Sequence, residues 1–143
     1  MAGGRERRVL QWPIMKTVMV VDPDETDRKI ALALLSGHYD AIGCASVTEA
    51  IAVARKRRPH AVVMDLAGAL SNGCYDPIGA AARIAPDASV VCSASQSTAI
   101  DYARTRGASG LIEKPYTADS LDAAVRLAAS QMAAERTPAR PPA

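Results

Sequence analysis

Four short apolar runs in this chain each end at a residue whose side chain could take part in chemistry. The ends are Asp22, Asp65, Ser93 and Lys114. A short apolar run bounded by turn residues is typical of a strand buried on both faces, as in a parallel sheet. Ligands and reactions lie just beyond the carboxyl ends of such strands. We therefore expect two carboxylates, a hydroxyl and an ammonium to meet at one edge of a sheet.

These apolar runs alternate with segments of helical periodicity. We predict strands at Thr17–Val21, Tyr39–Ala45, Ala61–Asp65, Ser89–Cys92 and Gly110–Glu113. We predict helices that follow Asp24 and Ser46 as N-caps, one that opens at Asp76-Pro77, and two more over about Thr98–Arg106 and Ala118–Ala134. Short crossovers between alternating strands and helices favour right-handed connections and a sheet covered on both faces. The predicted fold class is α/β, with a doubly wound, five-stranded parallel sheet in three α/β/α layers and a single domain.

Composition places the chain among ordinary globular proteins. Of its 143 residues 49% are hydrophobic and 22% are charged, and the formal net charge is +2. These values argue against a disordered chain and against direct nucleic-acid binding. The three cysteines share no metal-ligand or redox spacing, and no apolar stretch approaches the ~18 residues of a membrane span. We expect reduced thiols, a cytoplasmic location and no membrane contact.

The two ends of the chain differ in composition from its middle. Residues 1–15 show no clear periodicity and are expected to be a flexible lead-in, with Met15 as an alternative start. Residues 135–143 are rich in proline and alanine and are expected to be disordered. The globular domain is therefore predicted to span residues 16–134. Within it, we interpret the basic cluster Arg55–Arg58 as a solvated helix end, where cations suit the helix dipole.

Four short motifs follow one another in a recognisable order. They are Val20-Val21-Asp22, Val63-Met64-Asp65 with Gly73 after it, Cys92-Ser93-Ala94, and Lys114-Pro115-Tyr116. With this set the chain resembles, over residues 16–134, the flavodoxin-like receiver domains of bacterial response regulators in two-component signalling. The resemblance implies a stand-alone phosphorelay protein that accepts a phosphoryl group on Asp65 from a sensor histidine kinase or a phosphotransfer protein. It would catalyse only its own phosphorylation and dephosphorylation, and would signal through contact with a downstream protein.

The resemblance also implies roles for the residues at the predicted edge. A carboxylate that accepts a phosphoryl group needs a hard cation to neutralise the gathering negative charge. Mg²⁺ is bound by few carboxylates and several waters. Asp22, Asp65 and a backbone carbonyl near Ala67, in the loop expected after Asp65, would supply that site. Lys114 would pair with the phosphoryl group, and the Ser93 hydroxyl would bond another of its oxygens.

Three positions depart from the pattern of the family. Pro23 stands where a second acid usually follows the first strand, so Asp24, one position later, is the alternative metal ligand. Ala69 replaces the proline usual after the phosphoacceptor, and Leu111 replaces an aromatic residue that serves as a switch. These departures favour a second hypothesis, a degenerate receiver that acts as an interaction module without phosphorylation.

The output surface is expected on the helices at about Thr98–Arg106 and Ala118–Ala134 and on the strand between them. Tyr102 and Tyr116 are the large side chains there and would anchor a partner or a homodimer. The Lys114-Pro115 bond is predicted to be cis, because X-Pro bonds lose most of the trans preference and the resemblance implies a turn that aims the lysine into the site.

A third hypothesis starts from Asp22-Pro23-Asp24-Glu25-Thr26. This segment fits the Asp-x-Asp-x-Thr motif of haloacid-dehalogenase-type phosphatases, with Asp22 as nucleophile and Asp24 as acid/base. That family needs a further acidic motif on a strand after the lysine. Only a helix and the tail are predicted after Lys114, so this hypothesis ranks below the other two.

Overall fold

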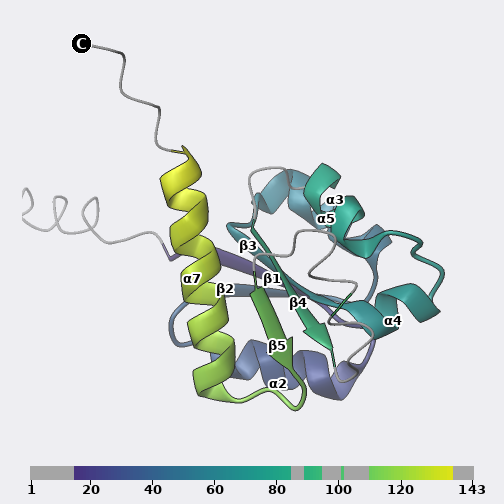
Figure 1. Cartoon of the computed structure of the whole chain (residues 1–143), viewed down its shortest axis with the longest axis horizontal. Coiled ribbons are helices and arrows are strands. Elements are labelled where there is room, and N and C mark those ends of the chain that lie inside the picture. Colours follow the sequence, from purple (N-terminus) through teal and green to yellow (C-terminus); the bar gives the residue numbers. More distant parts are fainter. Residues whose placement is uncertain (1–14, 85–88, 95–100, 102–109, 137–143) are drawn as a thin grey trace, which may run out of the picture.

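The computed structural model describes residues 15–84, 89–94, 101 and 110–136 (Figure 1). Its strands are β1 (Thr17–Val21), β2 (Asp40–Cys44), β3 (Ala61–Asp65), β4 (Ser89–Ala94) and β5 (Gly110–Glu113). Its helices are α2 (Glu25–Leu35), α3 (Val47–Arg57), α4 (Leu66–Ser71), α5 (Pro77–Ile84) and α7 (Ala118–Arg136). No helix in these ranges is both long and apolar enough to cross a membrane. The predicted helix at Thr98–Arg106 lies outside the described residues, apart from Asp101.

The five strands form one parallel sheet in the order β2-β1-β3-β4-β5. The fold class predicted from the sequence is confirmed. The strand order reverses between β1 and β3, which is where doubly wound sheets open a crevice beyond their carboxyl ends. Asp65, the last residue of β3, is in register with Ser93 of β4, and Asp22 directly follows β1. The sheet therefore brings the backbones of Asp22, Asp65 and Ser93 to one edge.

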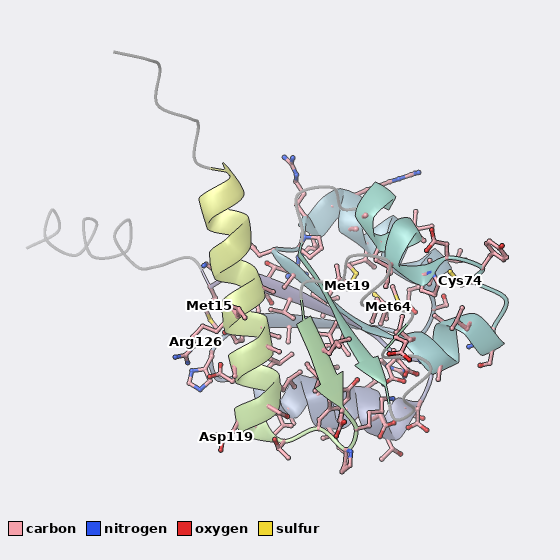
Figure 2. The ribbon with its side chains drawn as sticks, viewed as in Figure 1. Met15, Met19, Met64, Cys74, Asp119 and Arg126 are labelled. Carbon is pink, nitrogen blue, oxygen red and sulfur yellow. The ribbon has the colours of Figure 1, made fainter. Side chains whose placement is uncertain are left out.

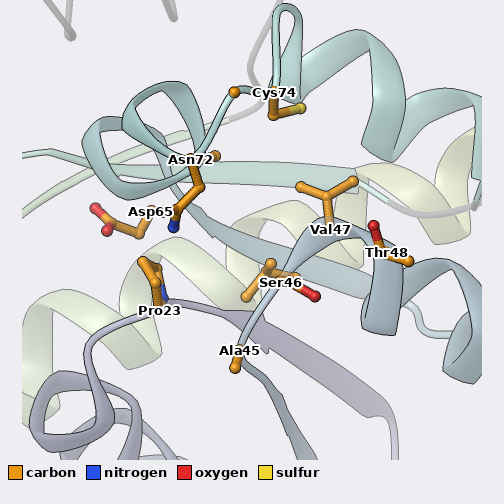
Figure 3. A pocket seen from close by; sticks show the side chains of 11 residues that line it. Pro23, Ala45, Ser46, Val47, Thr48, Asp65, Asn72 and Cys74 are labelled. Atoms are coloured by element: carbon orange, nitrogen blue, oxygen red, sulfur yellow. The ribbon is translucent and has the colours of Figure 1, made fainter.

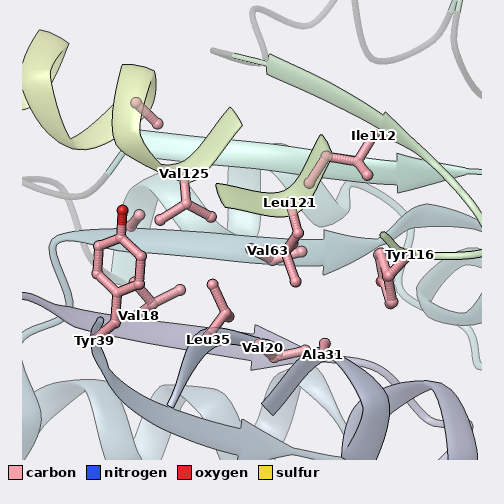
Figure 4. Packing of buried hydrophobic residues seen from close by; sticks show 12 residues of the cluster. Val18, Val20, Ala31, Leu35, Tyr39, Val63, Ile112, Tyr116, Leu121 and Val125 are labelled. Atoms are coloured by element: carbon pink, nitrogen blue, oxygen red, sulfur yellow. The ribbon is translucent and has the colours of Figure 1, made fainter. Parts of the chain in front are cut away.

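Two hydrophobic clusters cover the two faces of the sheet. Alternate residues of a strand point to opposite faces, so a strand buried on both sides must be apolar throughout. Met19 and Met64 lie in the cluster that packs under α3 and α5 (Figure 2). The other cluster joins β1, β3 and β5 to α2 and α7 (Figure 4). Its members include Val18, Val20, Val63, Ile112, Ala31, Leu35, Leu121 and Val125. These clusters fix the strands that carry the edge residues.

The helix starts follow the predicted caps. The Asp24 side chain accepts a hydrogen bond from Asp27 N at 2.9 Å, and Ser46 Oγ accepts one from Glu49 N at 3.1 Å. The Glu49 carboxylate accepts a hydrogen bond from Ala45 N at 2.9 Å. This resembles the predicted capping box, but the donor is the residue before the N-cap instead of the N-cap itself. The last helix was predicted to end at Ala134, whereas α7 continues to Arg136.

The segment after β3 differs from the prediction. We expected a loop from Leu66 to Asp76, but the chain turns directly into α4. Asp65 itself is the N-cap, and its Oδ2 accepts a hydrogen bond from Gly68 N at 3.2 Å. An aspartate at a strand end satisfies an otherwise unpaired amide of the first helical turn, which makes a helix possible there. The predicted cis bond between Lys114 and Pro115 is confirmed.

Candidate functional site

Asp22, Asp65 and Lys114 meet beyond the carboxyl ends of β1, β3 and β5. The Lys114 ammonium lies 2.8 Å from Asp22 Oδ2 and 3.4 Å from Asp65 Oδ1. Asp22 is fully buried, and the side chains of Asp65 and Lys114 are 9% and 14% exposed. The three strand ends therefore bring these charged groups together, as expected. Whether they carry out the predicted chemistry stays a prediction.

A third carboxylate, Asp27, belongs to the same cluster and was missed in the sequence. Its Oδ2 lies 2.9 Å from Lys114 Nζ, and its side chain is 36% exposed. Asp27 sits in the first turn of α2, four residues before Ala31 and eight before Leu35, both of which are buried. Residues at this spacing share one face of a helix. The sequence feature that could have revealed Asp27 is therefore an acidic residue at the start of the apolar face of α2, the face that packs on the sheet.

Asp24, the alternative metal ligand, does not point into the cluster. Its carboxylate is used as the N-cap of α2, and the residue is exposed. Only its backbone reaches the site, because Asp24 N donates to Asp22 Oδ1 at 2.9 Å. An aspartate one residue before a helix gains a strong backbone bond by capping. In this structure the Asp24 side chain therefore caps α2 instead of joining the cluster, and its role as an alternative metal ligand stays a prediction.

Asp22 is held by contacts on each of its oxygens. Besides Asp24 N and Lys114 Nζ, the Tyr116 hydroxyl lies 3.5 Å from Oδ2. The Arg28 guanidinium donates to the backbone carbonyl of Asp22 at 2.8 Å. A buried carboxylate is stable only when it is hydrogen-bonded or paired. Asp22 meets that condition with protein groups alone.

Burial and charge shift two titratable groups of the cluster. Burial raises the pKa of the Asp65 carboxyl, the charge of Asp22 raises it further, and Lys114 works against both. Burial alone would lower the pKa of the Lys114 ammonium, but hydrogen bonds to Asp22 and Asp27 outweigh it, so that pKa is raised. The ammonium also lies 5.6 Å from the centre of the Tyr116 ring, a favourable cation–π distance. Lys114 therefore stays charged, while Asp65 binds a proton more readily than an exposed aspartate does.

The donors expected for Mg²⁺ do not assemble into a magnesium site. Pro23 has no side-chain oxygen, and Asp24 caps α2. Ala67 lies in the first turn of α4 and not in the loop that the sequence suggested. In the described parts of the chain, no group of three His, Cys, Asp or Glu side chains is placed to hold a metal. The role of the Ala67 carbonyl as a metal ligand stays a prediction.

Pro23 and the backbone of α4 also close the space beside Asp65. A Cβ built on Gly68 would lie 2.7 Å from Pro23 Cδ, and closer still to Pro23 Cγ and to Asp65 Oδ2. Real Cβ atoms essentially never approach other atoms so closely. Gly68 is thus needed where helix α4, the proline ring and the carboxylate meet.

A pocket of about 240 Å³ opens on the side of Asp65 that faces α3 (Figure 3). Pro23 and Asp65 line one end, the start of α3 lines another, and Asn72 and Cys74 line the part beyond α4. This pocket lies at the β1/β3 reversal, where ligands bind in doubly wound sheets. Asp65 is one of its lining residues, and Figure 3 shows the Asp65 carboxylate directed away from Asn72 and Val47.

The remaining predicted residues are placed as follows. Ser93 lies in β4, in register with Asp65, so its backbone is at the expected edge. Leu111 is partly buried and packs against the cluster under α3 and α5. Tyr116 is only 8% exposed, because it packs under α2 and α7, so it is not the exposed anchor that we expected. Tyr102 lies outside the described residues.

Comparison with known proteins finds its matches among solved structures. No protein-family model and no curated protein matches the chain. The N-terminal signal receiver domain of a two-component response regulator from Bacteroides fragilis is 26% identical, with a TM-score of 0.71, and the match covers 82% of this chain and 98% of that one. NtrX from Brucella abortus is 25% identical with a TM-score of 0.73, over 84% of this chain but only 28% of NtrX. A CheY-like receiver domain protein from Methanospirillum hungatei is 16% identical with a TM-score of 0.70 over 85% of this chain, a likeness of fold alone.

Proposed function

We propose that this chain, which has the fold of a divergent response-regulator receiver domain, accepts a phosphoryl group on Asp65 and signals through contact with another protein. The observation that carries the proposal is the Asp65 carboxylate at the end of the central strand, with the Lys114 ammonium 3.4 Å away. An acyl phosphate concentrates negative charge on three oxygens, and a fixed ammonium beside it favours its formation. The proposed donor is a phosphohistidine on a sensor kinase or a phosphotransfer protein.

The proposed transfer needs one nucleophile and one leaving group. An Asp65 oxygen attacks the phosphorus, a P–O bond forms as the P–N bond to histidine breaks, and the departing imidazole nitrogen takes up a proton. To end the signal, water attacks the phosphorus, which releases inorganic phosphate and restores the carboxylate. The Lys114 ammonium would pair with the phosphoryl group, and the Ser93 hydroxyl would donate a hydrogen bond to a phosphoryl oxygen. The chain would act on itself only.

Magnesium is not part of this proposed mechanism. The sequence predicts it, but Pro23 has no side-chain oxygen, and Asp24 is used as the N-cap of α2. The charge that a metal would bring is assigned here to Lys114, which already touches Asp65. The labelling assay is therefore run with and without Mg²⁺.

A second candidate is a receiver that works without phosphorylation. It is favoured by the closeness of Pro23 and α4 to Asp65 and by the Asp65 side chain itself, which is only 9% exposed and is engaged as a helix cap. In that case the domain would be a protein-interaction module with a fixed conformation. The two candidates differ in one measurable property, the reactivity of Asp65.

Acetyl phosphate and intact-mass spectrometry distinguish the candidates. We expect the wild type to gain one phosphoryl group and Asp65→Asn to gain none. Asp119→Asn, which changes an exposed aspartate in the first turn of α7, is the matched control and should label like the wild type. No labelling of the wild type, with or without Mg²⁺, would favour the interaction module. Labelling that survives Asp65→Asn but is lost in Asp22→Asn would favour the phosphatase hypothesis.

A further inference from the structure

The cluster around Lys114 holds more acid than base. Asp22, Asp27 and Asp65 all lie within 3.4 Å of the one ammonium. Three negative charges against one positive charge leave a formal charge of −2, and Arg28, whose guanidinium bonds the Asp22 carbonyl, offsets part of it. Buried carboxylates repel one another strongly when no cation separates them. Lys114 is therefore the group that allows these acids to approach.

The position of Lys114 is fixed by two shorter contacts rather than by Asp65. Its bonds to Asp22 and Asp27 are 2.8 and 2.9 Å, whereas Asp65 is at 3.4 Å. Asp22 comes from the end of β1 and Asp27 from the first turn of α2, so the two acids hold the ammonium from two elements. Asp65 is left with a cation nearby but with the longest of the three contacts.

An ammonium that already touches all three carboxylates provides the positive charge that a divalent cation would otherwise supply. The two cations would compete, since each would have to occupy the space between Asp22 and Asp65 and they repel each other. Lys114 already occupies Asp22 Oδ2, so a metal that binds this oxygen would have to compete with the ammonium.

We infer that the Lys114 ammonium is the resident counter-ion of this site in place of a divalent metal, and that Asp27 is the positioning residue that keeps it there. The inference does not rest on the proposed phosphorylation, because it concerns the unmodified protein. If Asp65 is not phosphorylated, the inference about Lys114 still stands. If the Mg²⁺ measurement contradicts the inference, the proposed phosphorylation of Asp65 is still untested.

The first test is Mg²⁺ binding by isothermal titration calorimetry on the full chain, with no phosphodonor present. We expect the wild type to bind Mg²⁺ weakly and Lys114→Met to bind at least about tenfold more tightly, because three carboxylates lose their counter-ion. Lys29→Met, which removes an exposed lysine paired with Glu25, should bind like the wild type. Equal affinities in the wild type and Lys114→Met would overturn the inference.

The second test addresses Asp27 and does not require Lys114→Met to fold. The Lys114 ammonium is followed by nitrogen-detected NMR at one neutral pH in Asp27→Asn and in the control Glu25→Gln, an exposed acid on the same helix. Asp27→Asn should speed the exchange of the ammonium protons with water, because it removes one acceptor, and should tighten Mg²⁺ binding, whereas Glu25→Gln should change neither. If the two variants behave alike, Asp27 does not position Lys114 and the inference fails.

Discussion

Gly68→Ala should destabilise the fold, although alanine is the better helix former. Gly68 is the third residue of α4, where alanine would gain about 1 kcal/mol from helix propensity. Against this, its Cβ would lie 2.7 Å from Pro23 Cδ and closer to Asp65 Oδ2. Overpacking of this kind costs about 1–3 kcal/mol, and loss of the Asp65 cap would add about 1 kcal/mol. The helix-propensity gain and the loss of the cap nearly cancel, so we expect a net loss of about 1–3 kcal/mol in the free energy of unfolding.

Urea denaturation followed by far-ultraviolet circular dichroism measures this loss. A loss of this size corresponds to a decrease in Tm of roughly 3–15 °C for a domain of this length. Gly37→Ala is the control, because a Cβ there meets no atom within 4 Å.

A double-mutant cycle tests the cause. In a Pro23→Ala background the proline ring is gone, so Gly68→Ala should cost less, by at least about 0.5 kcal/mol. A Gly68→Ala variant as stable as the wild type would refute the crowded contact between α4 and Pro23. The same conclusion would follow if its cost were unchanged by Pro23→Ala.

Three further predictions concern the cap of α3 and the two shifted pKa values. Ser46→Ala should lower the free energy of unfolding by about 1 kcal/mol, because it removes the hydrogen bond that Ser46 Oγ accepts from Glu49 N. Thr48→Ala, at an exposed position of the same helix, should change it by less than about 0.5 kcal/mol. Equal losses in urea denaturation would contradict the cap. Asp65→Asn should be more stable than the wild type at neutral pH, because a raised folded pKa means that the charged carboxyl disfavours folding. Thermal scans should show that difference shrinking as pH falls through the raised pKa, and a constant difference would count against it. The stability that charged Lys114 contributes should be complete below the ordinary lysine pKa and should decline as pH rises from there toward the raised folded pKa. Alkaline thermal scans should therefore show the wild type losing stability relative to Lys114→Met in that window, and a constant difference would contradict the pairing.

The strands and most helix starts could be predicted because their causes are local. The apolar runs at β1 and β3 are too short for helices, and the turn residues that bound them leave little choice of register. Ser46 with Glu49 is a capping box that needs only four residues of sequence. The alternation of these elements then leaves few topologies open.

The departures from prediction depend on contacts between distant elements. Helix α4 contains a glycine and is followed by Asn72-Gly73, so its sequence suggests a turn. The Asp65 cap and the packing of Leu66 and Ala69 contribute to its stability. Tyr116 follows a strand and a proline, and nothing in its neighbourhood indicates that α2 and α7 will cover it. Such burial is decided by packing and has no short-range signal.

The choice between Asp24 and Asp27 is set by the phase of α2. Each residue of a helix turns about 100°, so a start shifted by one residue would rotate Asp27 away from Lys114. The start is fixed by Asp24 as N-cap, and Pro23, with its restricted φ, comes directly before it. The same capping role that removes Asp24 from the cluster therefore aims Asp27 into it. Pro23 itself adds no side-chain oxygen to the cluster, and the helix that starts just after it supplies Asp27 as a partner of Lys114.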